Sequence, residues 1–284
     1  MKSTSIGIVG AGTMGNGIAH VFSLFDFDVL VVDIDKSILD KAKSTIVKNM
    51  NRQLKKGTIN SKKMTDSLDR ILFSKSINDL KECDLVVEAI KEDVDVKSRV
   101  FADLDSICKK STILASNTSS ISINKLAEST KRPDKVIGMH FMNPVPIMKL
   151  IEIIVGDKTS KDCLDFIMDL SKIIDKIPVK CNDAPGFVSN RILMPMINEA
   201  ALCLDEGVAT VESIDKIMVL GMSHPMGPLK LADLIGIDVC IYILNILHNG
   251  FNNNKYKPAE VLLRMKKNNK LGKKTGEGFY KYEF

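Results

Sequence analysis

Runs of Val, Ile and Leu alternate with segments of helical periodicity over the first 180 residues or so. The strand-like runs lie at residues 5–10, 28–33, 83–90, 111–116, 135–141, 149–156 and 177–181. Between the first two runs, residues 11–25 place apolar side chains at the spacing of one helix face. Strands that are apolar at nearly every position are typical of a parallel sheet covered by helices on both faces. The pattern therefore predicts an α/β fold with a mostly parallel sheet.

Two charged segments of helical periodicity follow the second strand-like run. They cover residues 36–56 and 61–72 and are joined at Gly57 and Asn60. Since both segments carry many charges and few apolar positions, we expect them to form a helical hairpin inserted into the α/β domain.

Strand-like runs stop after residues 182–187, and the rest of the chain has helical periodicity. The helical segments are residues 190–207, 212–221, 231–247 and 258–267. Pro195 should start, bend or interrupt the first of these helices. We therefore predict two domains, an α/β domain over residues 1–186 and a smaller all-helical domain over residues 187–284.

Length and composition fit a two-domain protein of the cytoplasm. The chain has 284 residues, of which 45% are hydrophobic, and no run of about 18 apolar residues that could cross a membrane. The first strand-like run begins at residue 5, which leaves no room for a secretory leader. The six cysteines lie far apart, without the spacing of a zinc site or a disulfide framework. We expect reduced thiols and no metal site.

The net charge of +5 is concentrated at the C-terminal end. Residues 262–284 carry seven basic and two acidic side chains, so the rest of the chain has 33 of each and is neutral. This segment could be a solvated terminal helix or could contact phosphate locally. A basic tail on a neutral body, with only 5% aromatic residues, does not favour nucleic acid as a partner.

A glycine-rich motif follows the first strand-like run. Gly10, Gly12 and Gly15 form G-x-G-x-x-G, and Thr13 and Met14 lie inside it. In a strand–turn–helix unit, these glycines allow a tight turn, close approach to a pyrophosphate and close helix packing. The alternative is a packing turn that binds no ligand.

Asp33 ends the second strand-like run, 18 residues after Gly15. An acid at this place can hydrogen-bond the ribose hydroxyls of a dinucleotide and would repel a 2′-phosphate. The motif and the acid together predict binding of NAD in preference to NADP.

His140 ends one apolar run, and Glu152 is the one charge within the next. His140 alone could be a satisfied core residue, but a buried carboxylate such as that of Glu152 is costly unless it is paired or hydrogen-bonded. Neighbouring strands could bring the carboxylate beside the imidazole and fix its tautomer. Such a pair is suited to take the hydroxyl proton of an alcohol as hydride leaves the carbon, which contributes roughly 10² to 10⁴ in rate.

Two further polar segments fall where the same site could lie. Residues 115–120, ASNTSS, follow a strand-like run, at the end of the sheet where ligands bind in such folds. Asn190 and Arg191 open the first helix of the predicted second domain. For both segments the alternative is a simple capping role.

Seven motifs in order along the chain make the sequence resemble the 3-hydroxyacyl-CoA dehydrogenase family, and in particular its short, stand-alone 3-hydroxybutyryl-CoA dehydrogenases. The motifs are GAGTMG, DLVVEAI, ASNTSS, HFMNPVP, APGFVSNR, HPMGP and GKKTGEGFY. The resemblance implies a Rossmann-type domain that binds NAD and an oxidoreductase that interconverts an (S)-3-hydroxyacyl-CoA and a 3-ketoacyl-CoA. It also implies a homodimer formed through the helical domain, although contacts within that domain could bury the same surface.

The resemblance assigns roles to particular residues. It implies His140 as the general base, Glu152 as its orienting partner, and Ser119 and Asn190 as residues that hydrogen-bond the substrate and the imidazole. It further implies contacts to NAD and to the CoA moiety. The residues implied for NAD are Gly10, Gly12, Thr13, Met14, Gly15, Asp33, Glu92, Lys97, Asn117, Asn143 and Lys274, and those for CoA are Lys56 and Arg52.

The chain departs from the family pattern at three places and leaves two other functions open. Met142 replaces a phenylalanine, Asn49 replaces a serine that often contacts CoA, and Asn16 replaces a small residue. One alternative function is an NAD-dependent dehydrogenase of a free hydroxy acid, and the other is a non-catalytic, crystallin-like relative. Neither nucleic acid nor a membrane is an expected partner.

Overall fold

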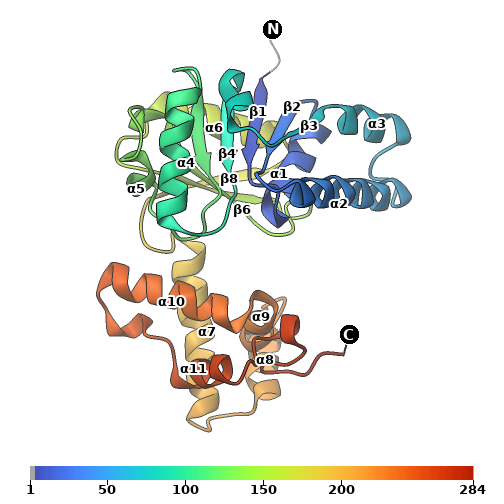
Figure 1. Ribbon diagram of the computed structural model, residues 1–284. Helices are drawn as coiled ribbons and strands as arrows, with labels where there is room; N and C mark the ends of the chain where they lie inside the picture. Colours follow the sequence, from blue (N-terminus) through green and yellow to red (C-terminus); the bar gives the residue numbers. More distant parts are fainter. Residues whose placement is uncertain (1–3, 284) are drawn as a thin grey trace. The chain divides into compact units, whose positions relative to one another are not determined.

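The computed structural model describes residues 4–283, and the chain divides into two compact units, one up to Ala184 and one from Pro185 (Figure 1). Each unit has its own apolar core. The division lies two residues before the domain boundary that the sequence suggested.

The first unit is built on an eight-stranded sheet. Its strand order is β3-β2-β1-β4-β5-β6-β7-β8. The strands are β1 (Ser5–Val9), β2 (Asp28–Val32), β3 (Ile71–Ser74), β4 (Leu85–Glu88), β5 (Ile113–Ser116), β6 (Val136–Phe141), β7 (Leu150–Val155) and β8 (Ile177–Asn182). All neighbouring strands are parallel except β6 and β7. The prediction of a mostly parallel, Rossmann-type α/β fold is confirmed.

Helices connect these strands and pack on the sheet. They are α1 (Thr13–Leu24), α2 (Lys36–Lys55), α3 (Ser61–Asp69), α4 (Val94–Ile107), α5 (Ile123–Ala127) and α6 (Lys161–Ile173), with 3₁₀ turns at Ile77–Glu82 and Pro133–Lys135. Helix α2 begins after Asp35, whose carboxylate accepts the Ser37 amide and so satisfies one of the unpaired N–H groups of the first turn. Helices α2 and α3 form the expected hairpin, which connects β2 to β3.

The hairpin differs from the prediction at its second helix. The sequence pattern extended that helix to residue 72, but α3 ends at Asp69, and Ile71–Ser74 form strand β3 beside β2. Strand β3 lies at the edge of the sheet, where Leu72 is 65% exposed. A four-residue edge strand has too few apolar positions to be distinguished by pattern from the last turn of a helix.

The second unit is helical, as predicted. Its helices are α7 (Ser189–Asp205), α8 (Val211–Gly221), α9 (Pro228–Ile235), α10 (Ile237–Phe251) and α11 (Glu260–Lys267), with 3₁₀ turns at Asn254–Tyr256 and Lys273–Thr275. Pro195 does not interrupt α7, which runs continuously through it. Among residues 4–283, no single helix is long and apolar enough to cross a membrane, and only α9 and α10 together, bent by 98°, reach that length and composition.

The basic C-terminal segment is a terminal helix only in its first part. After α11 ends at Lys267, the chain folds back onto two buried carboxylates. Asp233 accepts the amides of Phe279 and Tyr280, and Asp215 accepts the Tyr280 hydroxyl. Burial, followed by the hydrogen bond to Asp215, raises the pKa of the Tyr280 hydroxyl well above its usual value. These contacts favour a fixed turn over a longer helix.

Candidate active site

The glycine motif forms a tight turn between β1 and α1. Gly10 has φ = 97°, and a Cβ atom added to Gly15 would lie 1.8 Å from the Gly10 carbonyl oxygen. Both positions therefore require glycine. Gly12, in contrast, has ordinary backbone angles, and a Cβ atom there would meet nothing within 4 Å. The space beside Gly12, at the N-terminus of α1, fits an anionic group that approaches the backbone closely.

Asp33 is bound to the same turn. One carboxylate oxygen accepts the Ala11 amide at 2.9 Å, and the other accepts the Asp35 amide at 3.1 Å. The acid therefore lies directly beside the glycine turn, at the carboxyl end of β2. This is the arrangement in which a carboxylate can bind ribose hydroxyls.

Two pockets flank Gly12. One, of about 650 Å³, is lined by Gly10, Asp33 and mainly apolar side chains such as Ile38, Ile77 and Ile90. The other, of about 370 Å³, is lined by Gly12, Thr13 and Asn143, and also by Asn16 and Asn49. An apolar pocket beside an acid that can bind ribose suits an adenine ring, and the second pocket also borders Gly12. These residues fit a dinucleotide.

The acid–base pair lies on the two antiparallel strands of the sheet. His140 on β6 lies directly opposite Glu152 on β7, and its Nδ1 atom is 2.8 Å from the Glu152 carboxylate. Both side chains are buried. With the Nδ1 proton donated to the carboxylate, the lone pair of the imidazole is on Nε2, which is the atom that can accept a proton.

The ASNTSS segment forms a loop at the carboxyl end of β5, next to β6. The Asn117 carboxamide oxygen accepts the amide of Phe141, the residue after His140, at 2.9 Å. The loop that carries Ser119 is therefore joined to the strand that carries His140. Its last residues lead into α5, where the Ser122 hydroxyl accepts the Lys125 amide as the N-terminal cap.

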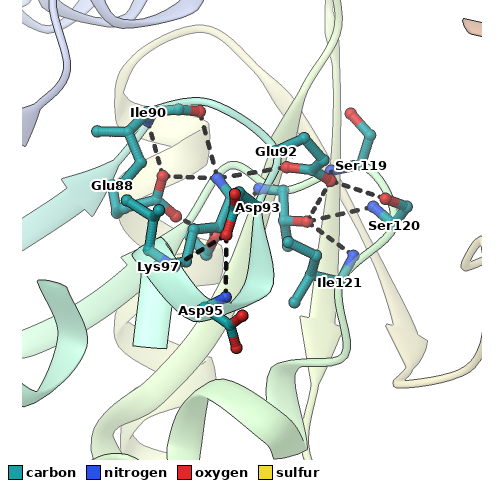
Figure 2. A network of polar contacts seen from close by, with 12 residues as sticks. Glu88, Ile90, Glu92, Asp93, Asp95, Lys97, Ser119, Ser120 and Ile121 are labelled. Atoms are coloured by element: carbon teal, nitrogen blue, oxygen red, sulfur yellow. Dashed lines mark hydrogen bonds and ion pairs between the residues drawn. The ribbon is translucent and has the colours of Figure 1, made fainter. Parts of the chain in front are cut away.

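Glu92 also binds this loop through hydrogen bonds (Figure 2). One of its carboxylate oxygens accepts the Thr118 hydroxyl, the Ser119 amide and the Ser120 hydroxyl, at 2.6, 2.9 and 2.8 Å. Burial alone would raise the pKa of Glu92, but the Lys97 ammonium and these hydrogen bonds outweigh burial and lower it. Glu92 is therefore a carboxylate that accepts from the loop.

Lys97 lies behind Glu92 rather than at the surface. Its ammonium is 2.6 Å from Glu88 and 3.3 Å from Glu92, and the side chain is 1% exposed. Glu88 is fully buried, and burial raises its pKa in spite of the opposing effect of Lys97. Sequence reasoning did not single out Glu88. Like Glu152, it is the one charge in an apolar strand, and that signal could have identified it.

The other predicted site residues lie on α2 and in the helical unit. Lys56 and Arg52 are exposed at the end of α2. In the helical unit, Asn190 is buried in the first turn of α7, and Lys274 forms an ion pair with Asp238. Over residues 4–283, no group of three or more His, Cys, Asp or Glu side chains could hold a metal ion.

Comparison with known proteins covers both units. Residues 5–184 match the model of the 3-hydroxyacyl-CoA dehydrogenase NAD binding domain, and residues 186–282 match that of the 3-hydroxyacyl-CoA dehydrogenase C-terminal domain. A probable 3-hydroxybutyryl-CoA dehydrogenase of Deinococcus radiodurans is 50% identical over 97% of this chain and 99% of its own length. The 3-hydroxybutyryl-CoA dehydrogenase of Clostridioides difficile is 47% identical over 98% and 99%.

Solved structures agree with the sequence comparison. The (S)-3-hydroxybutyryl-CoA dehydrogenase of Ralstonia eutropha superposes with a TM-score of 0.97, at 44% identity and with both chains fully covered. The glycine turn, the His–Glu pair and the match across both units lead to the same conclusion. The chain belongs to the 3-hydroxyacyl-CoA dehydrogenase family.

Proposed function

We propose that this chain catalyses the reversible NAD-dependent oxidation of (S)-3-hydroxybutyryl-CoA to acetoacetyl-CoA. The observation that carries the proposal is the buried His140–Glu152 pair, held at 2.8 Å on the sheet that also carries the dinucleotide turn. Relatives with this printed activity are 47% and 44% identical over nearly the whole chain.

In the direction of oxidation, Nε2 of His140 takes the proton of the substrate hydroxyl. The Glu152 carboxylate stabilises the imidazolium that forms and keeps the Nδ1 proton in place. Bound NAD would supply the acceptor for the hydride that leaves the carbon bearing this hydroxyl. In the reverse direction the imidazolium returns the proton to the ketone oxygen.

Two further polar residues complete the proposal. Ser119, on the loop held by Glu92, would hydrogen-bond the reacting oxygen of the substrate. Asn190, from the helical unit, would hydrogen-bond the substrate or the imidazole. Ser119 would favour the transition state by placing a donor where negative charge develops on oxygen, and Asn190 would either do the same or orient the imidazole.

Cations on α2 support CoA as the carrier of the acyl group. Lys43, Lys48, Arg52 and Lys55 line its outer face, and Lys56 follows at its end. Among residues 4–283, none of these five cations lies within 4 Å of a carboxylate, whereas Lys63 of α3 pairs with Asp26. Unpaired cations on one helix face suit the phosphates of CoA, and we assign Arg52 and Lys56 to that role.

The test is NADH oxidation with acetoacetyl-CoA, followed by cofactor absorbance, beside free acetoacetate at equal concentration. We expect rapid turnover of the CoA thioester only. Comparable turnover of the free acid would instead support a dehydrogenase of a free hydroxy acid. Absence of turnover with either would favour the crystallin-like alternative.

We also propose a homodimer formed by the helical unit. Several large apolar side chains of this unit are more than half exposed in the single chain. They are Ile192, Val208, Ile217, Leu220, Met222 and Leu234. A contiguous patch of exposed apolar side chains is typical of a protein–protein interface, and we propose that these residues contribute to one. A cytoplasmic location remains a prediction, supported by six cysteines that form no disulfide.

A further inference from the structure

Glu88 and Lys97 form a buried ion pair that the proposed chemistry does not use. Their side chains are 0% and 1% exposed, and the Lys97 ammonium lies 2.6 Å from the Glu88 carboxylate. Glu88 also accepts the Ile90 amide at 2.7 Å and the Ser116 hydroxyl at 2.6 Å. A buried ion pair is weak support for stability, since well-packed apolar residues are often equally stable. Its contacts therefore give the better indication of its role.

Two lines of contact lead from Glu88 to the loop that carries Ser119. The first passes through Lys97 to Glu92, which accepts from Thr118, Ser119 and Ser120 (Figure 2). The second passes through Ser116.

The Ser116 hydroxyl donates to Glu88 and accepts the Thr118 amide at 3.1 Å. The Asn117 amide also donates to the Glu88 carbonyl oxygen at 2.8 Å. Glu88 is thus linked to the loop at two places, through Ser116 at its start and through Lys97 and Glu92 further along it.

The loop in turn contacts the strand of the general base. Asn117 accepts the amide of Phe141, which follows His140. A shift of the Asn117–Ser120 loop would therefore move Ser119 and disturb the end of β6 together. Displacements of about 1 Å in such groups can cost about 10² in rate.

We propose that Glu88 is a positioning residue, which acts through Lys97 and Ser116 to hold the Asn117–Ser120 loop, and with it Ser119, in the geometry that catalysis requires. The proposal rests on the function assigned to His140 and Ser119 above. It also gives Lys97 a role through Glu92, in addition to the contact with NAD that the family resemblance implies.

Removing the Lys97 charge alone should lower activity more than removing both charges of the pair. Lys97→Met leaves the Glu88 and Glu92 carboxylates facing a buried position without a cation. Glu88→Gln in the same chain removes one of those charges and relieves the repulsion. A role in packing alone predicts the opposite, because each substitution would then add its own damage.

The experiment measures NADH-dependent reduction of acetoacetyl-CoA by Glu88→Gln, Lys97→Met, the double variant and Ser116→Ala. We expect kcat to fall about 10-fold in Glu88→Gln and Ser116→Ala and about 100-fold in Lys97→Met, with KM for NADH changed less than about 3-fold. The double variant should recover at least about 10-fold over Lys97→Met. Lys125→Met and Glu128→Gln, an exposed pair in the same unit, serve as controls.

Hydrogen exchange of the peptide over residues 115–121 gives a second measurement that needs no activity. Exchange should rise in Glu88→Gln and Ser116→Ala and stay unchanged in the controls. Ser116→Ala keeps the test valid if Lys97→Met does not fold. If the wild-type protein shows no turnover, the proposed function is rejected. Hydrogen exchange of residues 115–121 in the variants would still test the loop contacts.

Unchanged exchange and kcat in both variants would overturn the proposal. Faster exchange with unchanged kcat would do so too, because the loop would then be held without consequence for catalysis.

Discussion

His140 and Glu152 show how a charge can be kept inside an apolar sheet. Direct cross-strand register places the two side chains opposite one another, so that the carboxylate has a donor and the imidazole has a fixed tautomer. A slip of one residue would turn Glu152 to the other face of the sheet and leave both groups without this contact.

Substituting His140→Gln should lower turnover of acetoacetyl-CoA by at least about 100-fold, because glutamine cannot take or return the proton. NADH binding, followed by cofactor fluorescence, should survive, since the dinucleotide turn is unchanged. His248→Gln, at the end of α10, is the control and should remain active. Full activity of His140→Gln would show that His140 is not the general base.

Acid should reduce the stability advantage that Glu92 provides. Its folded-state pKa is lowered from 4.5, so its contribution is present above that pH and is lost as pH falls through the folded value. The difference in free energy of unfolding between wild type and Glu92→Gln should therefore be largest near neutral pH and narrow below about pH 4.5. Urea unfolding at a series of pH values measures it, and a pH-independent difference would contradict the assignment.

Among the single residues of the site, His140 and Glu152 could be placed on neighbouring strands from the sequence, because the two apolar runs are adjacent in the chain. Sequence reasoning did not find Glu88. The partner of Glu88 lies on a helix nine residues later, where an ordinary surface lysine would look the same. Burial of Lys97 depends on how α4 packs, which no local pattern specifies.

Among the elements, the turn between β1 and α1 contains glycines that are needed for two different reasons. Gly15 is required because the Gly10 carbonyl occupies the space of its Cβ atom. At Gly12, in contrast, the position of a Cβ atom is open space, and we expect a bound ligand to occupy it. The two positions should therefore respond differently to the same substitution.

Gly12→Ala should weaken NADH binding at least about 10-fold while thermal stability changes little, since the added methyl group meets only the ligand. Gly15→Ala should lower both, because the turn itself must move. Thermal unfolding and NADH titration of the two variants distinguish these outcomes. Equal losses of stability would show that the space at Gly12 is structural.

Elements with a strong apolar period were predictable, and short ones were not. The buried strands and most helices of the second unit follow directly from the pattern. The single helix expected over residues 231–247 is wrong, because the chain breaks at Gly236, with φ = 107°, into α9 and α10. Strand β3 was missed because tertiary pairing with β2, not its own sequence, makes Ile71–Ser74 extended. The end of the basic segment was missed because buried Asp233 fixes it from 46 residues away.

For the molecule as a whole, the proposal to test is that exposed apolar side chains of the helical unit form a dimer interface. Leu220 on α8 is 72% exposed, and burying a leucine contributes roughly 1.5–3 kcal/mol. Leu220→Asp should raise the dimer dissociation constant at least about 10-fold. Analytical ultracentrifugation measures this, with Leu72→Asp, a leucine 65% exposed in the other unit, as the control. Wild-type protein that is monomeric at micromolar concentration would reject the proposed dimer.

The bond between Asp33 and the Ala11 amide has a consequence for redesign of coenzyme choice. A designer who wanted the enzyme to accept a phosphorylated coenzyme would first remove the Asp33 charge. That change would also leave the Ala11 amide without its acceptor, at a cost of about 1–3 kcal/mol if no water replaces it. Serine or asparagine at position 33 would remove the charge and offer a neutral acceptor. Selectivity could then be altered without loosening the turn on which any dinucleotide depends.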